Sequence, residues 1–145
     1  MRRIARALRP RSVWVAAPDE PEIIKVANIQ HLATPIRAQL RDPVGAVELA
    51  GLLHPTPAVG GEPHAAAAPE IPALEGLDRG WYAGCVGWTD ANEDGEFCVA
   101  LRCALLRGRD ARCYAGVGVV ADSDPAEELA ETEIKLAALL PVLAA

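Results

Sequence analysis

Tyr114-Ala-Gly-Val-Gly-Val-Val-Ala-Asp-Ser-Asp-Pro-Ala-Glu-Glu-Leu-Ala-Glu-Thr-Glu-Ile-Lys135 is the stretch that says most about the fold of this chain. Its first part is apolar and interrupted by glycines, which is typical of a strand that leads into a turn. A helix is expected to start near Ser123, because Pro125 suits a first turn and the acidic residues there favour the positive end of the helix dipole. The stretch therefore predicts a strand, a turn and a C-terminal helix.

Two acidic residues of this helix form a candidate metal site. Glu128 and Glu131 are three positions apart, so they share one helix face, and Lys135 lies one turn further on. Two carboxylates this close repel each other, and Mg²⁺, which binds through one or two carboxylates plus substrate oxygens, would relieve the repulsion. A solvated, salt-bridged helix face is the alternative.

The glycines of the same stretch form a candidate anion site. Gly116 and Gly118 have the same parity, so one face of the expected strand carries no side chains there. Close packing between sheets and an amide-lined anion site both fit this pattern.

Arg102 is a candidate carboxylate ligand. If 96–106 is one strand, alternation leaves small residues and a single guanidinium on one face, with room for a carboxylate that arginine grips with two hydrogen bonds. An edge arginine paired with a surface acid is the alternative.

The order of elements predicts an α+β fold with a mainly antiparallel sheet and flanking helices. At 145 residues, one domain with an apolar core is expected. Pro55–Gly61 is expected to be a rigid loop. Helices are expected at Arg2–Leu8 and Val44–Leu53 and from about Ala65 to Glu75, and strands at Ser12–Ala17, Glu22–Leu40, Trp81–Trp88, Glu96–Leu106 and Ala111–Val120.

Composition excludes several classes of protein. The net charge of −6 argues against nucleic-acid binding, and no apolar run is long enough for a membrane helix. The four cysteines lack zinc-binding spacing and indicate reduced thiols of a cytoplasmic protein.

Several strings, in this order and spacing, resemble the C-terminal portion of the chorismate-utilising enzymes, which include isochorismate, salicylate, anthranilate and aminodeoxychorismate synthases. The resemblance covers essentially the whole chain and is closest to the isochorismate synthases. The strings are Asn28-Ile-Gln-His-Leu-Ala-Thr34, His54-Pro-Thr-Pro-Ala-Val-Gly-Gly61, Arg79-Gly-Trp-Tyr-Ala-Gly84, Gly95-Glu-Phe97 and Ala100-Leu-Arg102.

The resemblance implies a role for each candidate residue. Glu131 would be a Mg²⁺ ligand with Glu128 beside it in the metal shell, and Tyr82 and Arg102 would bind a substrate carboxylate with the amide of Gly116. Further residues would line the chorismate site: Lys135 by its charge, His31 and Thr34 around the ring and its hydroxyl, and Thr56 at the border.

The resemblance also implies that residues 1–145 lack part of the family's catalytic machinery. The family's general base, general acid and remaining metal-ligand glutamate belong to segments upstream of Met1, so residues 1–145 are expected to be the C-terminal part of a chorismate-binding domain. The chain is then part of a split or truncated isochorismate synthase that is active when the missing N-terminal portion is supplied, for example in trans. It is alternatively a non-catalytic chorismate-binding or interaction remnant, or part of a salicylate or anthranilate synthase-type enzyme. The residues do not separate a menaquinone from a siderophore pathway.

Overall fold

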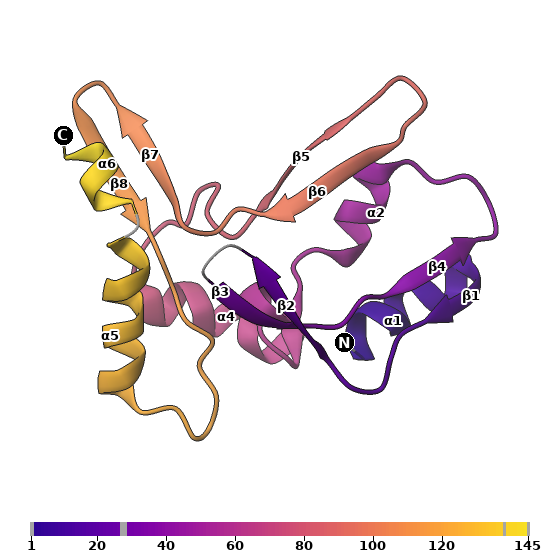
Figure 1. Ribbon diagram of the computed structural model, residues 1–145, viewed down its shortest axis with the longest axis horizontal. Coiled ribbons are helices and arrows are strands. Elements are labelled where there is room, and N and C mark those ends of the chain that lie inside the picture. The colour runs from indigo at the N-terminus through magenta and orange to yellow at the C-terminus, as the bar shows by residue number, and fades with distance from the viewer. Residues whose placement is uncertain (1, 27–28, 138, 145) are drawn as a thin grey trace. The chain divides into compact units, whose positions relative to one another are not determined.

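The computed structural model describes residues 2–26, 29–137 and 139–144 (Figure 1). The chain divides into two compact units, Met1–His54 with Thr89–Glu96 and Pro55–Trp88 with Phe97–Ala145. Helices and short two-stranded sheets come in blocks along the chain, as expected of the predicted α+β class. No helix in the described ranges is long and apolar enough to cross a membrane.

The first unit contains two antiparallel strand pairs and two α-helices. β1 pairs with β4, and β2 pairs with β3. Helix α1 ends before Pro10, as predicted, because proline cannot continue the backbone hydrogen bonding of a helix. The elements are α1 (Arg2–Leu8), the 3-10 turn η1 (Arg9–Arg11), β1 (Ser12–Ala16), β2 (Glu22–Val26), β3 (Ile29–Ala33), β4 (Arg37–Leu40) and α2 (Ala46–Leu53).

The prediction of one strand over Glu22–Leu40 is wrong. β2 and β3 pair with each other, from Glu22 opposite Ala33 to Val26 opposite Ile29. Period-two alternation continues through both strands of a hairpin, so the pattern alone does not reveal the reversal of the chain. Pro35 lies between β3 and β4, where no strand partner needs its missing N–H group.

The rest of the chain is built from hairpins and helices. β5 pairs with β6, and β7 pairs antiparallel with β8. Part of the predicted loop before α4 is a short helix, because Pro57 occupies its first turn. The elements are α3 (Pro57–Gly60), α4 (His64–Glu75), β5 (Cys85–Thr89), β6 (Gly95–Val99), β7 (Cys103–Arg107), β8 (Asp110–Tyr114), α5 (Pro125–Leu136) and α6 (Leu140–Leu143).

Three predicted strands are shorter than expected. The strand predicted at Trp81–Trp88 begins only at Cys85, after a turn. The run from 96 to 106 breaks between β6 and β7, and Arg102 has a φ of 49°, which is outside the extended region. The alternation that placed Arg102 on a small-residue face therefore does not hold. β8 ends at Tyr114, so Gly116 and Gly118 lie in an irregular segment and not on one strand face.

Little apolar surface is buried in the described part of the chain, contrary to the expected core. Leu8 and Ala83 are the buried apolar side chains, whereas Trp81 is 88% and Leu74 is 81% exposed. The accessible surface is 11096 Å², whereas a monomeric domain of this mass exposes about 7,100 Å². Exposed apolar surface on this scale is typical of a protein that contacts further polypeptide.

Gly61 is expected to be a critical position for stability. Its φ of 71° and ψ of 168° belong to a region that only glycine adopts readily, and an added Cβ would overlap Ala67 Cβ. We expect Gly61→Ala to lower the free energy of unfolding by about 2–4 kcal/mol, measured as a lower thermal midpoint. Gly76→Ala is the control, because Gly76 also has a positive φ but no atom within 4 Å of an added Cβ. Equal losses in both variants would contradict the role of the overlap.

Candidate functional site

Tyr82 is the centre of the candidate site. It lies in a turn in which its N–H donates to the Arg79 carbonyl at 2.9 Å. Its ring stacks on Tyr114, at the end of β8, with centroids 5.4 Å apart and an interplanar angle of 17°. Burial raises the pKa of Tyr82 above its usual value, although the positive charge of Arg79 acts in the opposite direction. The phenol is therefore protonated at neutral pH and can donate a hydrogen bond.

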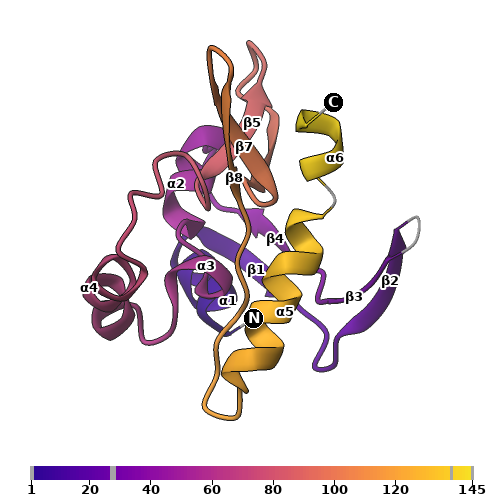
Figure 2. The ribbon, with the colours of Figure 1, turned by 90° about the vertical axis from the view of Figure 1, so that its left-hand side faces the viewer.

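Gly116 lies directly against the Tyr82 hydroxyl. A Cβ built on Gly116 would be 2.5 Å from Tyr82 Oη, so this position accepts no side chain without movement. Lys135 Nζ donates to the Gly116 carbonyl at 3.0 Å and is 2.5 Å from Glu131 Oε1. Figures 1 and 2 both show the segment after β8 running along α5 before the helix returns beside it. Tyr82, Gly116, Lys135 and Glu131 therefore form one connected cluster.

The two candidate metal ligands lie on α5, and both have protein partners. Glu131 forms the ion pair with Lys135, and Glu128 Oε1 accepts a hydrogen bond of 2.5 Å from Ser123 Oγ. Within the described ranges, no group of three or more metal-ligating side chains is present. Carboxylate oxygens such as those of Glu128 and Glu131 are the donors that Mg²⁺ prefers, and these two residues would supply only part of its ligands.

Arg102 is placed near the tyrosine pair by backbone contacts. The N–H of Ala100 donates to the Gly84 carbonyl at 2.8 Å, and Cys103 pairs with Tyr114 in the β7–β8 hairpin. The Arg102 side chain is exposed and has no hydrogen bond or ion pair with any other described residue. Its guanidinium group is therefore available to a ligand.

The other predicted residues are less closely connected. Thr56 precedes α3 in the same unit, and its half-buried side chain makes no capping hydrogen bond. His31 lies opposite Ile24 on β3 of the other unit, and its side chain is outside the described part of the structure. Thr34 follows β3 in that unit and is half-buried.

Sequence reasoning missed the residues that support the cluster. The sequence pattern predicts only a strand at Tyr114, and no spacing rule indicates that its ring meets Tyr82 across 32 positions. Glu75 and Arg79 do have the spacing of a helical ion pair, a usable signal, but α4 ends at Glu75. The sequence pattern indicates Ser123 only as the start of a helix and not as a partner of Glu128.

Comparison with known proteins identifies the family. Residues 1–144 match the family model described as chorismate binding enzyme. The chain belongs to the chorismate binding enzyme family. It is 49% identical over 142 residues to the salicylate biosynthesis isochorismate synthase of Pseudomonas aeruginosa, covering 98% of this chain and 30% of that protein. It is 46% identical over 129 residues to the isochorismate synthase MenF of Bacillus subtilis, covering 89% of this chain and 27% of that protein.

A solved structure confirms the partial family fold. The crystal structure assigned to a 2,3-dihydroxybenzoate-specific isochorismate synthase of Bacillus anthracis matches with a TM-score of 0.90 and 42% sequence identity. The match covers 97% of this chain and 38% of that one. The chain thus spans about a third of the length of its relatives in the chorismate binding enzyme family.

Proposed function

We propose that this chain forms one side of the site in which an isochorismate synthase-type enzyme binds chorismate and Mg²⁺. The observation that carries this proposal is the cluster of Tyr82, Gly116, Lys135 and Glu131, in which each residue contacts the next within one unit. The cluster combines a neutral hydrogen-bond donor (Tyr82), a backbone segment that no side chain covers (Gly116), a cation (Lys135) and a carboxylate (Glu131). A substrate with two carboxylates matches the first three groups, and a divalent metal matches the fourth.

Each residue has a role in this proposal. The protonated Tyr82 hydroxyl and the exposed Arg102 guanidinium bind a substrate carboxylate with the Gly116 amide, and Lys135 contributes positive charge. Glu131 and Glu128 hold Mg²⁺, which when bound would orient the ring carboxylate and offset negative charge. Thr56, in the same unit, borders the substrate, as the family resemblance implies.

The reaction proposed is the conversion of chorismate to isochorismate, in which water adds at C2 while the C4 hydroxyl leaves. It needs a general base to activate the water and a general acid to protonate the departing hydroxyl. The family resemblance implies a lysine as this base, and neither of the chain's two lysines, Lys25 and Lys135, matches its place. We propose that both groups come from polypeptide outside residues 1–145, in the same chain or in trans.

A chimera tests the proposal. This chain would replace the matching 142 residues of the Pseudomonas aeruginosa relative, and isochorismate formation would be measured with and without Mg²⁺. We expect Mg²⁺-dependent turnover, because the parent supplies the base and acid and this chain supplies the substrate side. A folded, monodisperse chimera that binds no chorismate, beside an active parent, would refute the proposal. Release of salicylate would instead support the salicylate synthase-type alternative.

Glu131 is expected to determine the Mg²⁺ requirement. In the active chimera, Glu131→Gln should raise the Mg²⁺ concentration for half-maximal turnover on the order of 10–100-fold, because one anionic metal ligand is lost. Glu133→Gln is the control, since Glu133 is an exposed carboxylate on the same helix. Lys135→Met removes the same ion pair without removing the carboxylate, so it should change the KM for chorismate more than the Mg²⁺ requirement. Equal Mg²⁺ requirements for the Glu131 and Glu133 variants would count against the metal role.

A further inference from the structure

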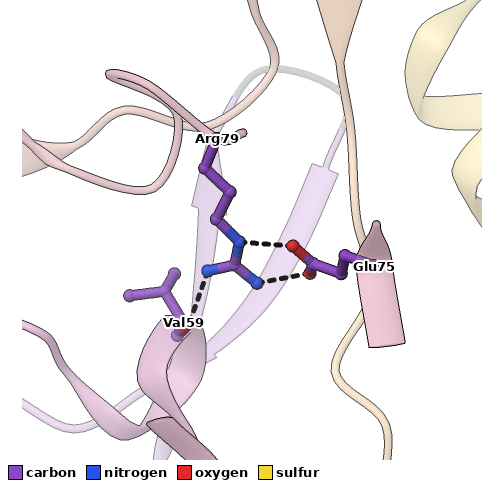
Figure 3. A network of polar contacts seen from close by, with 3 residues as sticks. All are labelled: Val59, Glu75 and Arg79. Carbon is purple, nitrogen blue, oxygen red and sulfur yellow. Dashed lines mark hydrogen bonds and ion pairs between the residues drawn. The ribbon is translucent and has the colours of Figure 1, made fainter. Parts of the chain in front are cut away.

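A second polar network, formed by Arg79, Glu75 and Val59, lies beside the Tyr82 ring. Arg79 donates from Nε and Nη2 to the two carboxylate oxygens of Glu75, at 2.7 and 2.5 Å. Its third nitrogen, Nη1, donates to the Val59 carbonyl at 2.8 Å, as Figure 3 shows. Arg79 therefore joins the end of α4 to the short helix α3 through a single side chain.

The geometry of this network restricts the movement of Arg79. The two parallel hydrogen bonds to Glu75 orient the plane of the guanidinium, and the bond to Val59 limits rotation in that plane. The Arg79 and Glu75 side chains are 26% and 34% exposed, so solvent screens the pair less than it screens a surface ion pair. The hydrogen bond to Glu75 raises the pKa of Arg79, so the guanidinium stays charged.

The restrained guanidinium lies over the Tyr82 ring. Arg79 Cζ is 5.7 Å from the ring centroid, within the range of a cation–π contact. Tyr114 stacks on the same ring, and the hydroxyl lies against Gly116. The ring is thus restrained by a cation, an aromatic ring and a backbone, whereas Tyr82 itself forms no side-chain hydrogen bond within the described ranges.

We propose that Glu75 and Arg79 are positioning residues that hold the Tyr82 hydroxyl at the Gly116 backbone, where it meets a substrate carboxylate. This inference rests on the proposed function of Tyr82 and adds how its position is maintained. Glu75 acts on the orientation of Arg79, and Arg79 acts on the Tyr82 ring. Neither residue needs to touch the substrate.

A double-mutant cycle in the chimera tests whether Arg79 acts through Tyr82. Tyr82→Phe and Arg79→Met should each raise the KM for chorismate about 10-fold with little change in kcat. The lost contact stabilises the bound substrate and the transition state equally, so its loss weakens binding without slowing the chemical step. The double variant should remain near 10-fold instead of reaching about 100-fold. Arg79→Lys keeps the charge and should restore part of the loss. Arg109→Met, at an exposed turn, is the control. Additive losses would overturn the proposal.

A second readout does not require chorismate. The chain has two tyrosines, so ¹³Cζ-tyrosine NMR of the chain, with Tyr114→Phe for assignment, reports the pKa of Tyr82 directly. The ionisable groups acting on Tyr82 are Arg79, Glu75 and Cys103. If Arg79 holds the ring in place, Arg79→Met should lower the Tyr82 pKa toward about 10, because the ring gains solvent. If the ring stays in place, losing the positive charge should raise this pKa, which would overturn the proposal.

The two readouts separate the positioning role from the proposed function. An unchanged KM in Tyr82→Phe, together with a lowered Tyr82 pKa in Arg79→Met, would support positioning and refute the substrate role of Tyr82. A raised KM in Tyr82→Phe, with additive losses and a raised pKa in Arg79→Met, would do the reverse.

Discussion

Gly116→Ala is expected to raise the KM of the chimera for chorismate about 10–100-fold. The added Cβ would be 2.5 Å from Tyr82 Oη, and the ring cannot move aside freely because Tyr114 stacks on it and Arg79 lies 5.7 Å from its centroid. Displacing the hydroxyl removes a hydrogen bond to a charged group, which contributes about 1.5–3 kcal/mol. Steady-state kinetics with chorismate measures the loss.

Two variants control this experiment. Gly118→Ala should have little effect, because no atom lies within 4 Å of a Cβ at that position. Combining Gly116→Ala with Tyr82→Phe removes the colliding hydroxyl, so the double variant should be no worse than Tyr82→Phe alone. If Gly116→Ala and Gly118→Ala had equal KM values, the close approach of Gly116 to Tyr82 would have no role in binding.

A polypeptide of residues 1–145 alone is expected to form no detectable isochorismate from chorismate and Mg²⁺. The reaction needs a general base and a general acid, and we propose that both come from outside these residues. Chromatography of the products should detect isochorismate with the chimera and none with the separate polypeptide. Turnover by the pure polypeptide would contradict this prediction.

The exposed apolar surface also predicts how the separate polypeptide behaves in solution. Side chains such as Trp81 and Val142, 88% and 76% exposed, favour self-association or binding of a hydrophobic dye by the separate polypeptide. Adding the remainder of the Pseudomonas aeruginosa relative in trans should reduce dye binding and produce turnover together. Reduced dye binding without turnover would favour the interaction remnant over the catalytic part.

Local signals in the sequence predicted α1, α2, α4 and α5, but not the short helices α3 and α6. Pro10 limits α1, and α5 begins at Pro125 after Asp124, whose side chain accepts hydrogen bonds from Ala126 and Glu127. These features depend on neighbours within one helical turn, so they are readable without tertiary structure. Strand boundaries were predicted less well. The single strand proposed for Glu22–Leu40 failed because alternation does not change where β2 reverses into β3.

The features of the candidate site also differ in whether the local sequence predicts them. The sequence by itself determined the family resemblance and the placement of Glu131 and Lys135 one helical turn apart, because helical periodicity is a local property. Only the tertiary structure decided that Tyr82 meets Gly116, that Tyr114 stacks on Tyr82 and that Arg79 restrains the ring. These contacts join segments far apart in the chain. They depend on how the β7–β8 hairpin packs against the turn that contains Tyr82, which no local sequence pattern encodes.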